Sequence, residues 1–280
     1  MKLLTLNTYS WMLEDSLSKL DQLAKAIHRE NFDIIALQEV NQTISAPELP
    51  VEYLLNRGFI FKDKSPKIKK DNFALNLIEK LHSLGTNYYW SFAKNHIGYD
   101  KFDEGVSILS RHKITAVTDF FISKSTSYSD YKTRKTVGLK TLINGSEKWF
   151  FSIHMGWWDD DTDPFSNQWN IVQNKLKKYQ SNEIYLMGDF NSPFEIRNQG
   201  YDLITKDKIW FDTHNLAINH DSGQTVIKKI DGWKNKTTPS AMRIDYIFKN
   251  SSDIIKSSNV IFNGDNYPIV SDHFGICIEE

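Results

Sequence analysis

The chain has 280 residues, enough to bury a large core, and we expect one domain over residues 1–280. Its 34 Lys and Arg balance 35 Asp and Glu, so no global positive charge favours the binding of long nucleic acid. A single cysteine excludes a disulfide framework within the chain, and no apolar run approaches the roughly 20 residues that span a bilayer.

The first third of the chain predicts a strand, a helix, a strand and a second helix. Residues 2–6 are strand-like, apolar residues recur at helical spacing over 17–27, and a continuous apolar run follows at 34–37. Residues 73–81 show helical spacing again, with Gly85 in the place of a C-cap. Because the opening segment is too short and becomes polar too quickly for a signal peptide, we expect a cytoplasmic protein.

The middle of the chain predicts consecutive strands. Its segments rich in β-branched and aromatic residues are 106–109, 114–122, 136–143 and 149–153. Polar turns separate them, and Asn144-Gly145 is typical of a tight hairpin turn. We therefore expect a meander or hairpins in this region.

The last part repeats the helix-to-strand order of the first. Apolar residues advance by four, three, four and three from Phe165 to Tyr179, which predicts a helix leading into a strand at 184–187. Further strands are expected at 244–248, 254–262 and 274–278. Strands and helices in both halves favour an α/β fold of two packed mixed sheets with helices outside.

Polar residues follow two of the predicted strands near the N-terminus. Glu39 comes directly after the apolar run 34–37, at the end of a strand where open α/β sheets place their sites, and could bind a hard cation. Asn7 ends the first strand and could place its amide oxygen beside it. An edge salt bridge for Glu39 and an Asx turn for Asn7 are the structural alternatives.

Gly188-Asp189-Phe190-Asn191 follows the strand at 184–187. In extended geometry Asp189 and Asn191 point to one face. An aspartate can hold a nucleophilic water and an asparagine can donate to a phosphoryl oxygen, although a simple turn also favours these residue types.

Two histidines lie beside strand ends with carboxylates available. His273 follows Asp272, and Asp245 could orient the imidazole of His273 and set its tautomer. His154 ends the strand at 149–153 and could donate to negative charge that develops on a phosphate, whereas a lone histidine is more often structural.

These motifs together resemble the endonuclease/exonuclease/phosphatase superfamily, in the order of that family and over nearly the whole chain. The motifs are Leu6-Asn7, Leu37-Gln38-Glu39-Val40, Glu104-Gly105-Val106, Ile153-His154, Gly188-Asp189-Phe190-Asn191, Ile244-Asp245-Tyr246 and Ser271-Asp272-His273. The resemblance implies a four-layered α/β sandwich of the deoxyribonuclease type. It also implies a metal-dependent phosphoester hydrolase that uses Mg²⁺, for which Mn²⁺ can substitute.

The resemblance further implies a role for each matching residue. Glu39 would be the main metal ligand, with Asn7 and Asp272 nearby. His273 would be the general base, and the other catalytic residues would be Asp245, Asp189, Asn191 and His154. Glu104 would hold His154, and Arg134, on a looser match, would bind phosphate.

The substrate is predicted from the sequence near these motifs. Trp157 and Trp158 follow His154 and precede an acidic loop, 159–163, that would repel a polyanionic backbone unless its charges point away. Aromatic residues at 88–102 and 157–169 could bind a sugar face or a nucleobase, or could pack in the core. The segments 87–92 and 95–100, with 154–158, resemble the bacterial maltose 6'-phosphate phosphatase branch, which implies a small sugar-phosphate substrate.

Three other functions stay open. A DNA or abasic-site endonuclease would require a basic groove, and a sphingomyelinase-like hydrolase would require a membrane-binding face. A catalytically inactive binding module would retain the fold without turnover. The balanced charge favours a small phosphorylated substrate, with no membrane and no obligate protein partner.

Overall fold

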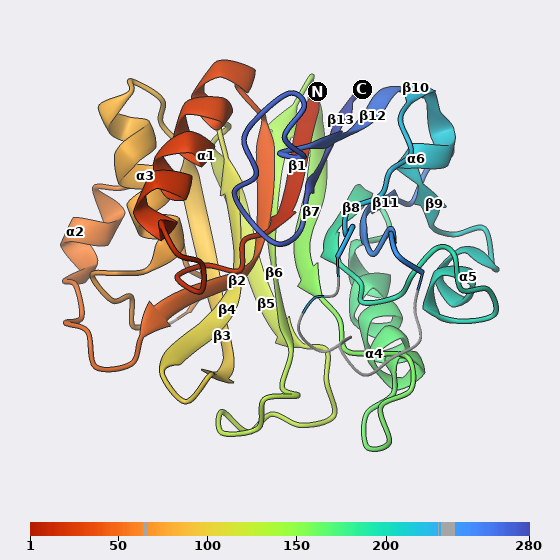
Figure 1. Cartoon of the computed structure of the whole chain (residues 1–280), viewed down its shortest axis with the longest axis horizontal. Coiled ribbons are helices and arrows are strands. Elements are labelled where there is room, and N and C mark those ends of the chain that lie inside the picture. Colours follow the sequence, from red (N-terminus) through yellow and green to blue (C-terminus); the bar gives the residue numbers. More distant parts are fainter. Residues whose placement is uncertain (64–65, 229, 231–238) are drawn as a thin grey trace.

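The computed structural model describes residues 1–63, 66–228, 230 and 239–280. Two β-sheets pack face to face, and helices cover the outer face of each sheet (Figure 1). Both sheets contain parallel and antiparallel pairs. This arrangement confirms the predicted four-layered α/β sandwich.

The first sheet has seven strands in the order β10-β12-β13-β1-β2-β4-β3. Its strands are β1 (Lys2–Asn7), β2 (Ile34–Thr43), β3 (Tyr89–Gly98), β4 (Phe102–Ser110), β10 (Ala217–His220), β12 (Ile255–Ile261) and β13 (Gly275–Glu279). The helices beside it are α1 (Ser16–Glu30), α2 (Val51–Leu55) and α3 (Phe73–Ser83). The parallel strands β1 and β2 are joined through α1, so both end at the same edge of the sheet.

The second sheet has six strands in the order β5-β6-β7-β8-β11-β9. Its strands are β5 (Ile114–Phe121), β6 (Lys135–Ile143), β7 (Ser146–His154), β8 (Glu183–Asp189), β9 (Phe211–Asp212) and β11 (Asp245–Lys249). The helices of this half are α4 (Phe165–Leu176), the 3₁₀ turn η1 (Lys177–Tyr179), α5 (Gly200–Thr205) and α6 (Thr213–Leu216). The parallel strands β7 and β8 are joined through α4 and repeat the β1–α1–β2 arrangement.

Three apolar cores separate the four layers, and strand periodicity assigns each side chain to its core. Leu4 and Leu6 of β1 face α1, whereas Leu3 lies in the core between the sheets. The regular stripe of α4 places Trp169 and Val172 against the second sheet. Alternate side chains of a strand point to opposite faces, so these assignments follow directly from the sequence.

Most predicted elements are found within a few residues of their expected bounds. The turn Asn144-Gly145 has the two positive φ angles, 51° and 79°, of a tight hairpin. One long strand, β3, was missed, although its aromatic residues are typical of a strand. Among the described residues, no helix is long and apolar enough to cross a membrane.

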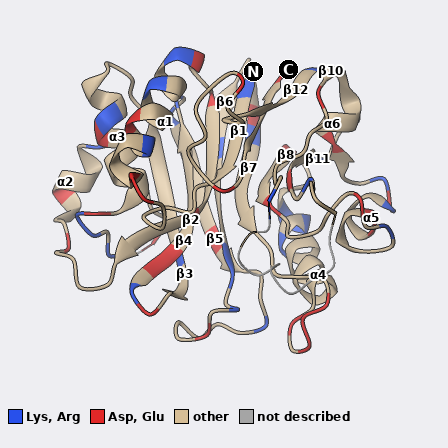
Figure 2. Ribbon diagram, viewed as in Figure 1, with Lys and Arg blue, Asp and Glu red and all other residues tan. Residues whose placement is uncertain are grey.

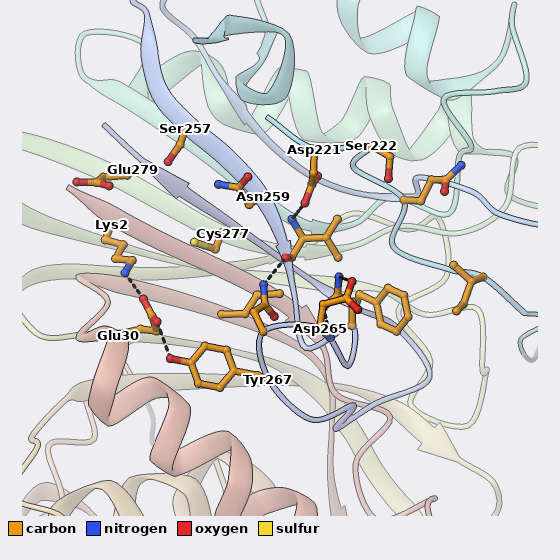
Figure 3. A pocket seen from close by; sticks show the side chains of 17 residues that line it. Lys2, Glu30, Asp221, Ser222, Ser257, Asn259, Asp265, Tyr267, Cys277 and Glu279 are labelled. Atoms are coloured by element: carbon orange, nitrogen blue, oxygen red, sulfur yellow. Dashed lines mark hydrogen bonds and ion pairs between the residues drawn. The ribbon is translucent and has the colours of Figure 1, made fainter. Parts of the chain in front are cut away.

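Charges of both signs are mixed over helices, strands and loops (Figure 2). A cavity of about 730 Å³ lies beside β12 and β13, between Lys2, Tyr267 and Asp221 (Figure 3). Its polar groups bind one another: Glu30 pairs with Lys2 and accepts from Tyr267, and Asp221 accepts from the backbone amide of Val260. Cys277 also lines this cavity, and burial raises the pKa of its thiol to about 12, in agreement with a packing role.

A buried ion cluster closes the far end of the second sheet. Lys249 is fully buried, and its Nζ lies 3.1 Å from Glu183 and 2.5 Å from Glu280. Burial raises the pKa of Glu183, but hydrogen bonds from Lys148, Tyr185 and Lys249 outweigh this and lower it to about 2. Glu183 is therefore ionised in the folded protein under conditions where the unfolded chain is protonated.

We expect Glu183→Gln to lower the free energy of unfolding by about 2 kcal/mol at pH 7, because the buried Lys249 loses one of its carboxylate partners. The folded pKa is depressed, so this contribution is present above the unfolded value of 4.5 and is lost as the pH falls towards 2. Urea denaturation of both proteins at pH 7 and pH 3 measures it. Glu147→Gln, at an exposed ion pair with Lys140, is the control and should change stability by less than about 0.5 kcal/mol. An equal effect of the two substitutions would contradict the prediction.

Candidate active site

Strand topology brings the predicted site residues to one edge of the sandwich. The register pairs Asn7 of β1 with Gln38 of β2, and His154 of β7 with Asp189 of β8. Strand β11 runs antiparallel to β8 and begins at Asp245, opposite Asp189. Carboxyl ends of parallel strands meet at the same edge, and the loop before β13 adds Asp272 and His273.

Two local distortions of the backbone shape this edge. The register of β2 against β4 shifts between Leu37 and Val40, and Glu39 within this bulge has a φ of 49°. Gly188 has a φ of 156°, and a Cβ there would lie 1.8 Å from the carbonyl oxygen of Ile153. Only glycine allows β7 and β8 to approach this closely directly before Asp189.

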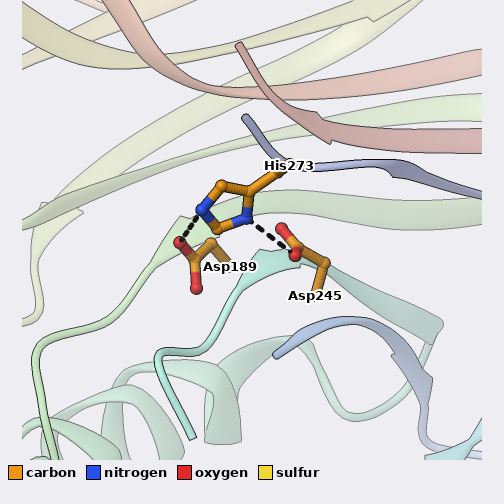
Figure 4. A group of neighbouring side chains, drawn as sticks. All are labelled: Asp189, Asp245 and His273. Atoms are coloured by element: carbon orange, nitrogen blue, oxygen red, sulfur yellow. Dashed lines mark hydrogen bonds and ion pairs between the residues drawn. The ribbon is translucent and has the colours of Figure 1, made fainter. Parts of the chain in front are cut away.

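His273, Asp245 and Asp189 form a buried group (Figure 4). Nδ1 of His273 lies 2.9 Å from Oδ2 of Asp245, and its Nε2 lies 3.9 Å from Oδ2 of Asp189. Burial lowers the pKa of His273, but the surrounding carboxylates, Asp245 first, reverse this and raise it to about 10.

Asp189 is held on both oxygens. Oδ1 accepts from the backbone amide of Asn191 at 2.8 Å, and Oδ2 accepts from Nδ2 of Asn7 at 3.0 Å. Burial and the charge of Asp245 raise the pKa of Asp189 to about 7. Asn191, with a φ of 46°, donates from Nδ2 to the carbonyl of Met155, so both side chains are fixed in place.

Asn7 links the two sheets at the site. Its Nδ2 donates to Glu39 at 2.9 Å as well as to Asp189, and its Oδ1 accepts from the backbone amide of Tyr9. Ser271 donates to the backbone carbonyl of Asn7 and thereby ties the loop of His273 to β1. The structure shows Asn7 as a bridge between two carboxylates, and its role as a metal ligand stays a prediction.

Glu39 and Asp272, the predicted metal ligands, lie outside the group whose ligand atoms are within 4.8 Å of one another, which among the described residues is Asp189, Asp245 and His273. Burial and the charges of Glu104 and Asp272 raise the pKa of Glu39 well above its usual value. The pKa values of Glu104 and Asp272 are also raised, in each case mainly by burial. Like charges gathered in this way are costly unless a cation neutralises them, and oxygen ligands are those that Mg²⁺ prefers. Glu39 and Asp272 remain partly exposed, so both can accept a ligand.

His154 lies beside Asp189 and not beside Glu104, the residue expected to hold it. Its Nε2 is 3.7 Å from Oδ2 of Asp189, and its Nδ1 is buried with no hydrogen bond to any residue that the structure describes. Burial and the charge of Arg134 lower its pKa, so the imidazole is neutral. Glu104 does not hold His154: it faces His96 instead, with 3.4 Å between Oε1 and Nε2.

Arg134 is buried near these groups. The residue is 5% exposed, and its Nη1 donates to the carbonyl of Tyr131 at 2.6 Å. Among the described residues its Nε has no hydrogen-bond partner, although a buried guanidinium normally satisfies its donors. An anion is therefore the expected partner.

A cavity of about 260 Å³ joins these residues. One side, here called the reacting side, is formed by Glu39, His154, Asp189, Asn191, Asp272 and His273. The other, here called the hairpin side, is formed by His96, Ile97, Gly98, Tyr99, Glu104, Tyr131 and Arg134. Tyr9, Trp157 and Ile230 complete the lining.

The structure corrects part of the predicted substrate site. Trp157 lines the cavity, but Trp158 does not: its ring packs against Phe165 of α4, with 6.3 Å between the ring centroids. Most of the aromatic cluster is buried in the cores, namely Tyr88, Trp90, Phe92, Phe102 and Trp169. Tyr99 is the member of the 88–102 group that reaches the cavity.

The acidic loop 159–163 is held by its own contacts and does not line the cavity. Asp160 pairs with Lys132 at 2.8 Å and accepts from the backbone amides of Thr162 and Asp163. Asp163 is buried and accepts from the backbone amide of Lys124. The loop therefore gives no direct argument against a polyanionic substrate.

Sequence reasoning missed His96 and did not assign Tyr9 or Tyr131 to the site. His96 lies in β3, the strand that was not predicted. An aromatic segment followed by Asn95-His96 and a hairpin turn is the signal that indicates a strand here.

Comparison with known proteins shows which family has this geometry. A family model described as Endonuclease/Exonuclease/phosphatase family matches residues 10–273. The solved structure of an endonuclease/exonuclease/phosphatase family protein from Leptotrichia buccalis is 35% identical, with a TM-score of 0.86. The match covers 100% of this chain and 98% of that chain. Comparison with curated proteins found no match.

Two more distant structures share the fold. A mannosyl-6-phosphatase from Bacteroides thetaiotaomicron is 18% identical with a TM-score of 0.66, over 100% of this chain and 98% of that one. TDP2 from D. rerio, complexed with a single-strand DNA product, is 15% identical with a TM-score of 0.61, over 99% and 97%. Since the family model spans most of the sequence and a 35% identical relative matches throughout, the chain belongs to the endonuclease/exonuclease/phosphatase family, whose members are metal-dependent phosphoesterases.

Proposed function

We propose that this protein is a Mg²⁺-dependent phosphatase that releases inorganic phosphate from a sugar phosphate, such as maltose 6'-phosphate, in the cytoplasm. The observation that carries the proposal is the cavity of about 260 Å³ that contains both the catalytic group and the buried Arg134. This volume lies just below the range of drug-sized ligands, roughly 300–1,000 Å³, and suits one phosphate with one sugar ring. A second ring of a disaccharide would lie at the mouth.

The proposed reaction is in-line attack of water on phosphorus, which forms one P–O bond and breaks the P–O bond to the sugar. The sugar oxygen leaves with the electron pair of that bond and takes up a proton from solvent water. Asp189 holds the water, and His273 takes its proton while Asp245 fixes the imidazole through the 2.9 Å hydrogen bond. Asn191, His154 and Arg134 donate to the phosphoryl oxygens as negative charge grows. Mg²⁺ bound by Glu39, Asn7 and Asp272 would neutralise part of that charge.

The balanced and interspersed charges of the chain support a small substrate over long DNA. Lys and Arg are interspersed with Asp and Glu along the elements, whereas a DNA-binding face gathers cations (Figure 2). The fold itself gives no preference, because the same fold carries a sugar phosphatase and a protein with bound DNA product. Turnover must therefore separate the two functions.

The test measures phosphate release from maltose 6'-phosphate and glucose 6-phosphate, and nicking of supercoiled and abasic DNA, with and without Mg²⁺. We expect Mg²⁺-dependent phosphate release that Asp189→Ala abolishes. Asp202→Ala, which removes a half-buried aspartate of α5 away from the cavity, is the matched control and should retain full activity. DNA cleavage without phosphate release would refute the phosphatase and support an endonuclease with the same catalytic residues.

A further inference from the structure

The hairpin side of the cavity contains a histidine to which the reaction above assigns no role. His96 is 4% exposed, lines the cavity and lies directly across from Glu104 in the register of β3 and β4. That register shifts between Lys94 and His96, so a bulge at Asn95 turns His96 towards the site. Bulges beside active sites commonly re-aim one side chain in this way.

The contacts of His96 determine which ring nitrogen is free. Nδ1 lies 2.9 Å from the carbonyl oxygen of Thr133, which can only accept, and 3.3 Å from Nη1 of Arg134. Because the contact with the carbonyl is the shorter one, Nδ1 carries the proton and donates it there. Nε2 is then an acceptor that faces Glu104. Burial and the charge of Arg134 lower the pKa of His96 to about 3, in agreement with a neutral ring.

Nε2 of His96 and Oε1 of Glu104 form a pair of acceptors on the cavity wall. Their separation of 3.4 Å is too long for a good hydrogen bond between them. The carboxylate lies over Gly98, where a Cβ would come within 2.7 Å of Oε2, so this position of Glu104 depends on glycine. Two buried acceptors side by side are satisfied by a ligand that brings hydroxyl donors.

The mouth of the hairpin side is built from exposed aromatic rings. Tyr99 and Tyr131 are 48% and 58% exposed and line the cavity. Tyr99 and Asp100 both have a φ of 53°, two consecutive strained residues in the turn between β3 and β4. This turn places a flat ring beside the acceptor pair, and rings with nearby acceptors suit a polyol with apolar faces.

We propose that His96 is a specificity-determining residue that, together with Glu104, binds a hydroxyl group on the alcohol part of a sugar-phosphate substrate. The proposal rests on the phosphatase function above. It adds the place in the cavity where the sugar, the leaving group of the reaction, is bound. The hydroxyl donates to Nε2 of His96, while Arg134, whose Nε is unpartnered in the same wall, binds the phosphate. Deoxyribose within a DNA strand has no free hydroxyl that could donate to these acceptors.

Two substitutions of His96 test this proposal, because asparagine and glutamine each reproduce one of the two ring nitrogens. His96→Asn keeps a donor where Nδ1 lies and removes the acceptor at Nε2, whereas His96→Gln can return an acceptor there. We expect His96→Asn to lower kcat/KM for glucose 6-phosphate about tenfold, mainly through KM, because one hydrogen bond to the substrate is lost. Hydrolysis of p-nitrophenyl phosphate, which has no hydroxyl on its leaving group, should change less than about twofold, and His96→Gln should retain most of the activity on the sugar phosphate.

Monodeoxy analogues of glucose 6-phosphate supply a second measurement that does not depend on the folding of a variant. The wild-type protein should discriminate about tenfold against the analogue that lacks the bound hydroxyl, and His96→Asn should not. Equal loss on sugar and aryl phosphates, or no discrimination by the wild type among the analogues, would refute the role of His96 and leave the phosphatase standing. A wild-type protein that hydrolyses neither kind of monoester would refute the phosphatase itself.

Discussion

His273→Ala is expected to lower kcat/KM about 10³-fold, because the group that takes the proton from water is lost. Asp245→Asn is expected to cost about 100-fold, since it leaves the imidazole in place but removes the charge that orients it and sets its tautomer. The 2.9 Å contact between the two residues, both nearly fully buried, is the basis for both values. Steady-state kinetics on the best sugar phosphate measures them.

Two controls separate chemistry from folding in this experiment. His28→Ala removes an exposed histidine of α1 and should leave kcat/KM unchanged. Thermal denaturation should show that Asp245→Asn remains folded. The double variant should cost little more than His273→Ala alone, because the two residues act as a unit. Retention of more than about a tenth of the activity by His273→Ala would contradict the assigned role.

Mg²⁺ is expected to raise the thermal stability of the wild-type protein and to have little effect on Glu39→Gln. Chelation with EDTA should abolish activity, and Mg²⁺ should restore it. At about 100 times its dissociation constant, a cation that binds only the folded state adds roughly 2.7 kcal/mol, or on the order of 5 °C in Tm for a chain of this size. Glu39 is chosen because burial, together with the charges of Glu104 and Asp272, raises its pKa well above its usual value.

The apo form of Glu39→Gln gives an independent readout. Removing one of several crowded negative charges should leave the Tm of the metal-free protein unchanged or raise it. Glu48→Gln, at an exposed site paired with Lys67 and Lys69, is the control and should keep the full response to Mg²⁺. An Mg²⁺-dependent rise in Tm that is equal in Glu39→Gln and the wild type would contradict the role of Glu39 as the main ligand.

The predictable part of the site consists of residues that end strands. Asn7, His154 and Asp189 end β1, β7 and β8, and Asp245 begins β11, so their place at one edge follows from strand order alone. The orientation of the amide of Asn7 could not be predicted, because it depends on Glu39 and Asp189, which come from two other strands.

The partner of Glu104 was predicted wrongly for a physical reason that the sequence does not display. Whether Glu104 faces His154 or His96 depends on the bulge in β3, which shifts the pairing by one residue between Lys94 and His96. The exclusion of Trp158 and of the loop 159–163 from the cavity has a similar origin. Their positions are determined by contacts with α4 and with Lys132, which lie outside the local motif.

The sequence by itself determined the layers, the order of the elements and the residues at the strand ends, because the 3.6- and 2-residue periodicities and residue type are local properties. Only the tertiary structure decided how the cavity is closed. Its hairpin side combines residues of β3, β4 and the segment before β6, and it depends on a register shift, on the positive φ of Tyr99 and on the buried Arg134. Such features arise from pairing between distant segments, and no periodicity within one segment encodes them.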